Sequence, residues 1–427
     1  MADGSPASRA ATLRPVASPE SPASPASATG EAPAPSATGA APGPPVTVGV
    51  EEEFLLADPM TGFPVPAAER VLEELRRGRA SDGTEFKHEL MASQVETTSG
   101  ICTQLSELAG QLSTGRRRLA EEARRLGLVV LPTGAPAHTA GPAQLTRGTR
   151  YEEIRDIYAG VVSDYEACGC QVHVRVPDRE TAVAVVGRLR HWLPTLLALS
   201  VNSPFHHGLD TGYGSWRMVM QSRFPGSGVP PHFATAADYD EELNRLVACG
   251  TLADARQTFW LVRPSECFPT VEFRVADAAA TVDEAVLQAA LSRALVTTAV
   301  EELERGIEAP PVRDQLAAAA VWNAARHGLD GDAVDLRRER TVPATRLLYE
   351  LIRQVTPALE ESGDLERVQR LLGRLTEAGT GAERQRAAAA RGHRALLGRL
   401  AEEAVRPVDE ALSPDRTPTV SVSRREP

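Results

Sequence analysis

The stretch VGVEEEFLL, residues 48–56, places three consecutive glutamates inside an apolar run that otherwise predicts a buried β-strand. Strands disfavour glutamate, and neighbouring like charges repel each other. Because side chains alternate between the two faces of a strand, Glu51 and Glu53 share one face, and Glu52 lies on the other face with Val50. The stretch therefore predicts a strand with two carboxylates on one face, and the pattern alone gives Glu52 no role.

Polar side chains recur on one face of two further predicted strands. In CGCQVHVRV, Gln171, His173 and Arg175 share a face, and in TVEFRVAD, Glu272 and Arg274 do the same. Each strand taken alone is more simply explained by one solvated face, as antiparallel sheets often have. Taken together the residues favour a shared site, because carboxylates and imidazole suit Mg²⁺ or Mn²⁺ and arginines suit anionic oxygens. The pattern predicts a site for nucleotide phosphates.

A fourth segment, HELMASQVETTSG, contributes Glu89 and Glu96. Their separation of seven residues is odd, so a regular strand would place them on opposite faces. If both serve one site, the strand must bulge or break between them.

The composition limits the function classes. The chain has 427 residues, a net charge of −11 and 42% hydrophobic residues, which is enough for a large core. The acidic balance argues against a general nucleic-acid or anionic-membrane binder. No apolar run approaches the roughly 18 residues of a membrane span, and no export signal is evident, so a cytoplasmic protein is expected.

The chain predicts one folded domain between two tails. Residues 1–45 are dominated by Ala, Pro, Ser and Gly and are predicted to be disordered, as is the shorter tail at 408–427. Residues 46–407 are predicted to form the domain. Its strands are expected at 47–56, 84–98 with a break, 128–132, 169–176, 257–263 and 269–277. Its helices are expected at 66–79, 102–126, 151–166, 178–200, 236–249, 281–306, 313–327, 343–361 and 363–405, the last interrupted near Gly379. This order favours an α+β fold with helices packed on one face of the sheet.

The cysteines and the adjacent histidines are more simply explained as packing or loop residues than as metal ligands or catalytic groups. The five cysteines are scattered and predict reduced thiols, with Cys168 and Cys170 more simply packed than bound to zinc. Adjacent residues rarely serve one site, so His206 and His207 are predicted to be loop residues. Lys87 is the only lysine, which excludes a P-loop and leaves phosphates to arginines, backbone amides or metal ions.

Five motifs in order resemble the bacterial carboxylate–amine ligases of the YbdK type, a group also called glutamate–cysteine ligase 2. They are VGVEEEFLLADPMTG, HELMASQVETTSGICT, CGCQVHVRVPDRETA, NSPF…DTGYGSWR and RPSECFPTVEFRVAD. The resemblance covers roughly residues 46–330, with a similar helical end beyond, and leaves out both tails.

The resemblance implies the catalytic fold shared by glutamine synthetase and γ-glutamylcysteine synthetase. That fold is a curved, largely antiparallel sheet with helices on its convex face, followed here by a helical carboxyl-terminal part. It also implies transfer of the ATP γ-phosphate to a substrate carboxylate and attack of an amine on the acyl phosphate. The implied reactants are a glutamate-like acid and a cysteine-like amine, with ATP and Mg²⁺ or Mn²⁺ as cofactors, and a homodimer is one implied assembly.

Site residues follow from the matched motifs. The implied metal ligands are Glu51, Glu53, Glu89, Glu96, His173 and Glu272. Arg274 would contact the transferring phosphoryl oxygens, and Arg217, with Arg150 and Arg223, would hold the substrate carboxylate or a phosphate.

Three positions depart from the family pattern: Arg175, Leu209 and Leu261. They leave open a ligase for a different acid and amine. They also leave open a paralogue that binds nucleotide or metabolite without turnover. A kinase or hydrolase on the same fold is a third alternative.

Overall fold

A computed structural model describes residues 46–77, 83–139 and 141–408. The predicted tail at 1–45 lies outside the described residues, as does the predicted tail at 408–427 apart from its first residue.

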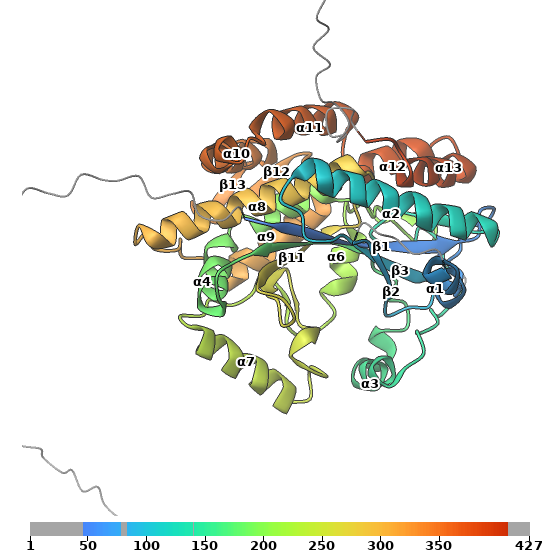
Figure 1. The fold of residues 1–427 in the computed structure, drawn as a ribbon, viewed down its shortest axis with the longest axis horizontal. Helices are drawn as coiled ribbons and strands as arrows, with labels where there is room; N and C mark the ends of the chain where they lie inside the picture. The colour runs from blue at the N-terminus through green and yellow to red at the C-terminus, as the bar shows by residue number, and fades with distance from the viewer. Residues whose placement is uncertain (1–45, 78–82, 140, 409–427) are drawn as a thin grey trace, which may run out of the picture. The chain divides into compact units, whose positions relative to one another are not determined.

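β1 runs through the middle of a seven-stranded sheet (Figure 1). The order is β10-β11-β5-β1-β3-β2, and β4 pairs with the second half of β1; every pair is antiparallel. The strands are β1 (Val48–Ala57), β2 (Glu85–His88), β3 (Gln94–Thr98), β4 (Val129–Leu131), β5 (Gly169–Arg175), β10 (Val262–Pro264) and β11 (Thr270–Asp277). The central position of β1 means that its polar face meets the polar faces of its neighbours.

The register aligns the polar residues across strands. Glu51 pairs with Gln171 on β5, and Glu53 pairs with Glu96 on β3. Glu272 on β11 pairs with His173 on β5. Directly paired residues project from the same face of a sheet, so the alternation predicted from the sequence brings the carboxylates and the histidine together.

The predicted strand 84–98 is in fact a hairpin. β2 ends at His88 and β3 begins at Gln94, and the two strands pair antiparallel with Lys87 opposite Glu96. Glu89 therefore lies in the connection rather than in a strand. Because Glu89 and Glu96 do not lie on one continuous strand, their odd spacing does not place them on opposite faces of the sheet.

Helices cover the face of the sheet opposite Glu51 and Glu53. Figure 1 shows α2 and α8 above the sheet, α10 to α13 above them, and α3 and α7 below. The helices are α1 (Ala68–Arg77), α2 (Leu105–Arg125), α3 (Thr149–Tyr158), α4 (Arg179–Leu189), α5 (Leu193–Ser200), α6 (Trp216–Gln221), α7 (Ala236–Ala248), α8 (Val282–Glu304), α9 (Asp314–His327), α10 (Ala344–Glu361), α11 (Leu365–Ala378), α12 (Gly381–Ala389) and α13 (His393–Ala404). Short pairings complete the structure: β6 (Phe205–His206) with β7 (Leu209–Asp210), β8 (Ser227–Gly228) with β9 (Phe259–Trp260), and β12 (Asp332–Asp335) with β13 (Arg340–Pro343).

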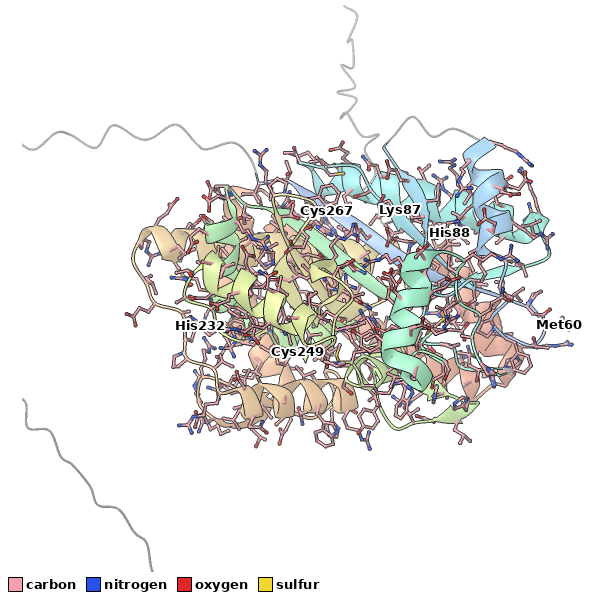
Figure 2. The ribbon with its side chains drawn as sticks, turned by 90° about the horizontal axis from the view of Figure 1, so that it is seen from below. Met60, Lys87, His88, His232, Cys249 and Cys267 are labelled. Atoms are coloured by element: carbon pink, nitrogen blue, oxygen red, sulfur yellow. The ribbon has the colours of Figure 1, made fainter. Side chains whose placement is uncertain are left out.

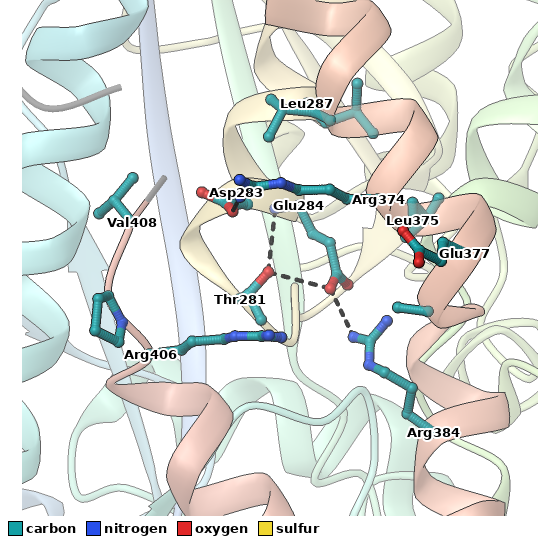
Figure 3. Close-up of a pocket in the computed structure, with 13 residues that line it drawn as sticks. Thr281, Asp283, Glu284, Leu287, Arg374, Leu375, Glu377, Arg384, Arg406 and Val408 are labelled. Atoms are coloured by element: carbon teal, nitrogen blue, oxygen red, sulfur yellow. Dashed lines mark hydrogen bonds and ion pairs between the residues drawn. The ribbon is translucent and has the colours of Figure 1, made fainter. Parts of the chain in front are cut away.

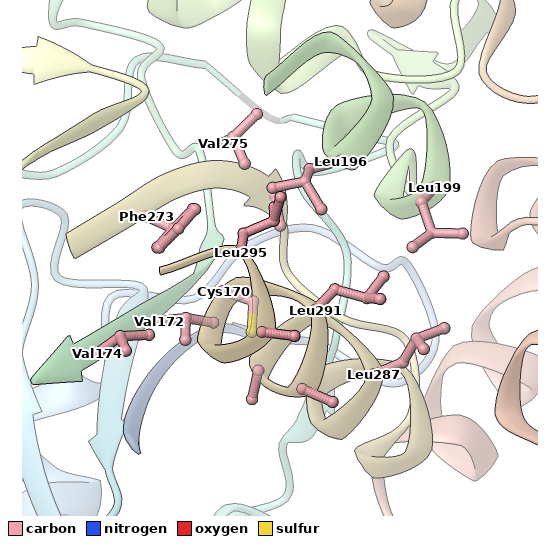
Figure 4. Close-up of a cluster of buried hydrophobic side chains, with 14 of the residues drawn as sticks. Cys170, Val172, Val174, Leu196, Leu199, Phe273, Val275, Leu287, Leu291 and Leu295 are labelled. Carbon is pink, nitrogen blue, oxygen red and sulfur yellow. The ribbon is translucent and has the colours of Figure 1, made fainter. Parts of the chain in front are cut away.

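The core lies between the sheet and α8. Val172 and Val174 of β5 and Phe273 of β11 face Leu291 and Leu295 of α8, and all five are nearly inaccessible (Figure 4). Burying each such side chain stabilises the fold by about 1.5–3 kcal/mol relative to exposure. The apolar face predicted for these strands is therefore the face that holds the helices.

Glu52 has a structural partner on this apolar face. Both Glu52 and Arg116 of α2 are only 1% exposed. The Arg116 guanidinium donates to both Glu52 oxygens, at 3.0 and 2.5 Å. It also donates to the carbonyl oxygens of Ala279 and Ala280, at 2.8 and 3.0 Å. The pair is buried with its hydrogen bonds satisfied, which is what a buried ion pair requires.

The α+β fold with an antiparallel sheet is confirmed, and some boundaries differ. The prediction of one helix over 178–200 is wrong, because α4 ends at Leu189 and α5 begins at Leu193. Pro194 lies in the first turn of α5, where its missing N–H costs nothing, whereas in the interior of a longer helix it would remove a hydrogen bond. The helix predicted at 151–166 ends at Tyr158. Among the described residues, no helix is both long and apolar enough to cross a membrane.

Replacing one partner of the Glu52–Arg116 pair should destabilise the fold strongly. Arg116→Met leaves Glu52 charged and buried, so we expect a loss of about 3–5 kcal/mol in the free energy of unfolding. The double variant Glu52→Leu/Arg116→Met should recover most of that loss, because no charge is then stranded. Urea denaturation of the single and double variants measures both effects. Equal stability of Arg116→Met and the parent would show that the pair is not structural.

Candidate active site

The polar face of the sheet opens into a pocket of about 300 Å³. It is lined by every sequence-predicted site residue except Arg223. Its lining also includes residues of α3 and residues 256–259 and 265–268, which flank β10, and Figure 2 views the molecule from the side of α3. The residues that it gathers come from β1, β3, β5, β11, α3 and α6, so no single segment carries the site.

Glu53 is held in place at the floor of the pocket. Its oxygens accept a hydrogen bond from the Gly169 amide at 2.6 Å and one from the Gln171 side chain at 2.5 Å. Burial raises the pKa of Glu53, and the positive charges of Arg217 and Arg274 oppose that rise. The carboxylate is thus fixed in orientation without being fully neutralised by a single partner.

Three carboxylates converge beside this position. One oxygen of each of Glu53, Glu89 and Glu96 lies within 4.8 Å of the other two. Burial and the Glu53 charge raise the pKa of Glu89 to about 7, and burial with the Glu51 charge raises the pKa of Glu96. The Lys87 ammonium lies 3.7 Å from Glu96 and offsets part of this repulsion. Such crowding of oxygen ligands is the arrangement that hard divalent cations bind.

His173 is oriented with one nitrogen free toward the carboxylates. Its Nδ1 lies 2.9 Å from the Thr270 hydroxyl, and its Nε2 lies 3.6 Å from a Glu51 oxygen. Burial alone would lower the pKa of His173, but the neighbouring Glu51 and Glu272 carboxylates raise it. Nε2 is buried and has no hydrogen-bond partner among the described residues. A ring fixed through one nitrogen, with the other unpartnered beside carboxylates, is typical of a metal ligand.

Glu272 sits between two arginines. Arg263 donates to both of its oxygens, at 2.9 and 3.1 Å, and Arg274 donates to one of them. Although burial would raise the pKa of Glu272, these two arginines hold it well below its usual range. Arg274 also donates to the Gln171 side-chain oxygen at 2.6 Å, which fixes its guanidinium over the floor of the pocket.

Arg217 is a buried arginine with an unused donor. It is 3% exposed, donates through Nη2 to the Arg274 carbonyl at 3.0 Å, and lies 3.9 Å from Asp277. A Cβ on Gly169 would come within 2.6 Å of Nη2, so a larger residue there would force the Arg217 guanidinium to shift. Its Nη1 is buried, makes no hydrogen bond among the described residues and lies 3.9 Å from Asp277 Oδ1, so its nearest charged partner is that aspartate. Because Arg217 lines the pocket and has a donor that makes no hydrogen bond to the described residues, its guanidinium suits an anionic ligand.

The two remaining predicted arginines are placed differently. Arg150 lines the pocket and is paired with Asp254. Arg223 lies outside the pocket lining and donates to Asp164 at 2.8 Å.

Two residues that the sequence prediction omitted support the site. Arg263 ends the predicted strand 257–263, and its pairing opposite Glu272 follows only from the strand register. Asp277 accepts hydrogen bonds from the hydroxyls of Ser203 and Ser215, both at 2.7 Å, and lies behind Arg217. The only sequence signals were an arginine at a strand end and an aspartate at the end of TVEFRVAD.

A second pocket of about 340 Å³ adjoins the first and shares Glu51, His173 and Phe268 with it. Its lining includes Ile101, which is 81% exposed, and Arg175. Of the three departures from the family pattern, only Arg175 borders either pocket. Leu261 is buried in the core, and Leu209 is exposed on β7.

A larger cavity of about 840 Å³ lies on the helical side, between α8, α11, α12 and residues 406–408 (Figure 3). Arg384 pairs there with Glu284 at 2.6 Å, and Thr281 caps α8 by accepting from the Glu284 amide. None of the sequence-predicted site residues lines this cavity.

Comparison with known proteins places this chain in a family. The family model described as glutamate–cysteine ligase family 2 matches residues 47–409. A provisionally named glutamate–cysteine ligase 2-2 of Saccharopolyspora erythraea is 53% identical over 348 residues, which cover 81% of this chain and 89% of the relative. A provisionally named glutamate–cysteine ligase 2-2 of Mycolicibacterium vanbaalenii is 44% identical over 81% of this chain and 94% of its own length.

Solved structures share the fold at low identity. The glutamate–cysteine ligase of Francisella tularensis, in complex with AMP, matches with a TM-score of 0.63 and 11% identity, over 86% of this chain and 91% of that one. A bifunctional glutathione synthetase of Pasteurella multocida matches with a TM-score of 0.62 and 17% identity, over 84% of this chain and 52% of that one. These similarities confirm the glutamine-synthetase-like fold that the sequence predicted.

Removing Arg263 should lower the free energy of unfolding, because Arg263 is a buried partner of Glu272. In Arg263→Met, Glu272 keeps only Arg274 as a guanidinium partner, so we expect a loss of about 3 kcal/mol in the free energy of unfolding. Arg256→Met is the matched control. Arg256 lines the same pocket but is largely exposed and pairs with Asp254 at 3.4 Å, so its removal should cost less than about 1 kcal/mol. Denaturant titration compares the two, and equal losses would contradict the role given to Arg263.

Proposed function

We propose that this chain, which belongs to the glutamate–cysteine ligase family 2, uses its polar pocket to activate a carboxylate with ATP and to join it to an amine. ATP-dependent carboxylate–amine ligation, with formation of an amide, is the activity that the family membership supports. The observation that carries the proposal is the convergence of Glu51, Glu53, Glu89, Glu96, His173 and Glu272 beside Arg217 and Arg274 in one pocket.

Glu51, Glu53, Glu89, Glu96 and His173 suit divalent cations, with Mg²⁺ or Mn²⁺ the expected ions. Glu272 is proposed as a further ligand from the resemblance alone, since both of its oxygens accept from arginines. The evidence for this fit is the converging oxygens of Glu53, Glu89 and Glu96, and the unpartnered Nε2 of His173. Bound there, the ions would neutralise the phosphates and orient them for in-line attack by the acid. The protein supplies the fixed positions: Gly169 holds Glu53, and Thr270 holds His173.

The arginines suit the negative charge on the phosphoryl group that is transferred from ATP to the carboxylate. ATP and a carboxylate are both anionic, so they approach each other only where positive groups offset their repulsion. We propose that Arg274, which faces the pocket beside Glu272, contacts the transferring phosphoryl oxygens. We propose that Arg217, which lines the pocket and whose Nη1 makes no hydrogen bond within the described part of the chain, holds the carboxylate end of the acid.

The two adjoining pockets suggest how the substrates divide the site. The second pocket, with Ile101 and Phe268 at its lining, is the more apolar, and it meets the polar pocket at Glu51 and His173. We propose that the base and sugar of ATP occupy the second pocket and that the phosphates extend past Glu51 toward Arg274. Arg175, which lines the second pocket, would then lie near the nucleotide rather than the acid.

We further propose a glutamate-like acid and a cysteine-like amine, on the strength of the relatives' names. Of the three departures, Leu209 and Leu261 lie outside both pockets, so they give no reason in the site itself to exclude these substrates. Reduced cysteines and ATP consumption both suit the cytoplasm, which is the proposed location.

The reaction should require both substrates. Purified protein with ATP, Mg²⁺, glutamate and cysteine should release phosphate and form a γ-glutamyl amide, and omission of either the acid or the amine should stop turnover. Phosphate release and product mass measure the outcome. Phosphate release without an amine would instead show a kinase or hydrolase, and nucleotide-induced thermal stabilisation without turnover on a broad panel of acids and amines would show a binding paralogue.

Glu53→Gln tests the metal assignment. Glutamine matches the size of glutamate and removes a ligand charge, but its single oxygen can accept from only one of Gly169 and Gln171, so kcat should fall roughly 100-fold or more while the sheet and its core stay intact. Glu74→Gln on α1, an exposed glutamate, should leave kcat unchanged. Steady-state rates over a range of Mg²⁺ concentrations make the comparison. Wild-type turnover by Glu53→Gln at limiting Mg²⁺ would refute the assignment.

Ile101→Asp tests the place of the nucleotide. The charge lies in the proposed base pocket, so the KM for ATP should rise by about 10-fold, which corresponds to about 1.4 kcal/mol, while the KM for the acid stays the same. The fold should be unaffected because Ile101 is 81% exposed. Met60→Asp is the control, since Met60 is also exposed and lies away from Lys87 and Cys267 in Figure 2. A rise in the KM for the acid alone would reverse the proposed order of the substrates.

A further inference from the structure

A second group of metal-type side chains lies outside the active-site pocket. Asp164, His206 and His207 each offer one ligand atom, and these atoms lie within 4.8 Å of one another. None of the three lines the polar pocket or the apolar pocket beside it. Asp164 follows α3, whereas the two histidines belong to the β6–β7 hairpin, so the group joins segments about 40 residues apart in the chain.

The β6–β7 hairpin explains how the side chains of two adjacent histidines come close together. β6 and β7 pair with His206 opposite Leu209, which leaves His207 and Gly208 as a two-residue loop. Both loop residues have positive φ, 49° for His207 and 77° for Gly208, as in a type I′ turn. The turn breaks the alternation of a regular strand, and the two imidazole rings lie with centroids 3.8 Å apart. The structure places the pair at a hairpin turn, in line with the prediction of loop residues, and this turn brings the two rings together.

Neighbouring groups hold each of the three side chains. His207 Nδ1 lies 2.8 Å from the Thr139 hydroxyl, which leaves Nε2 as the free nitrogen. Arg223 donates to Asp164 Oδ1 at 2.8 Å, so Oδ2 is the oxygen that a cation could take. The His206 ring packs against Trp216, with ring centroids 5.2 Å apart. Such outer contacts fix ligand orientation in metal sites.

One buried nitrogen of this group also lacks a hydrogen-bond partner among the described residues. His206 Nδ1 is buried and has no hydrogen-bond partner among the described residues. Leaving a buried nitrogen unpaired is costly, and a bound ion at the ring would give the imidazole a partner. This observation is independent of the convergence of the three side chains.

We propose that Asp164, His206 and His207 bind one divalent transition-metal ion of the zinc type, separate from the cations of the active site. Two imidazole nitrogens and one carboxylate oxygen are the donors that Zn²⁺ and Co²⁺ favour, whereas Mg²⁺ prefers the all-oxygen cluster around Glu53. His207 is exposed, so a fourth position is open to water. The ion would tie the hairpin to the segment that leads into Tyr165, a residue of the active-site lining.

Cobalt binding tests the proposal on the full chain. Protein stripped of metal with a chelator is titrated with Co²⁺ in excess Mg²⁺, which occupies the carboxylate cluster, and visible absorption reports nitrogen-ligated Co²⁺. We expect one equivalent in the wild type and the same band in Glu53→Gln. Zn²⁺ should displace the Co²⁺, and calorimetry should give the same stoichiometry.

Variants decide where the ion sits. His207→Asn should weaken Co²⁺ binding by at least about 10-fold, and it should fold normally because the side chain is exposed. Asp164→Asn should give a similar loss, which guards against a failure confined to one variant. His232→Asn, an exposed histidine elsewhere in Figure 2, is the matched control and should bind as the wild type does. Unchanged binding by His207→Asn, no band in the wild type, or loss of the band in Glu53→Gln would overturn the proposal.

Discussion

Three consecutive glutamates in the central strand are the constraint on which the rest of this structure depends. A charged side chain inside a sheet is tolerated only where positive charge or hydrogen bonds compensate it. Glu52 meets this condition through Arg116, which binds both of its oxygens and two carbonyls of the segment before α8. Glu51 and Glu53 face the other way, where His173, Arg217 and Arg274 surround them. The strand thus divides its charge between a structural face and a chemical face.

Hydrogen bonds within the protein orient the side chains of the chemical face. Gly169 and Gln171 fix Glu53, Thr270 fixes His173, and Arg263 fixes Glu272. Preorganised charges stabilise a transition state without reorganising during the reaction, and this is where electrostatic catalysis gains most of its effect. His173 Nε2 and Arg217 Nη1 make no hydrogen bonds with the residues that the structure describes, and each lies near a carboxylate, Glu51 at 3.6 Å and Asp277 at 3.9 Å.

Turns regroup residues that sequence spacing keeps apart. Glu89 and Glu96 meet because β2 and β3 form a hairpin, not because a strand bulges. His206 and His207 lie side by side because a turn with positive φ replaces strand alternation. In both cases a few backbone angles decide which side chains share a site, and spacing along the chain does not reveal them.

The sequence by itself determined the fold class, nearly all the main strands, and which glutamates of VGVEEEFLL share a face, because the strand period of two is a local property of the chain. It also supplied the motifs that led to the family, and hence the residues that gather in the pocket. Only the tertiary structure showed the partner of Glu52, the pairing of Arg263 with Glu272, and the separation of Arg223 from the pocket. These depend on contacts between segments distant in the chain, whose geometry is set by strand register and helix packing rather than by local pattern.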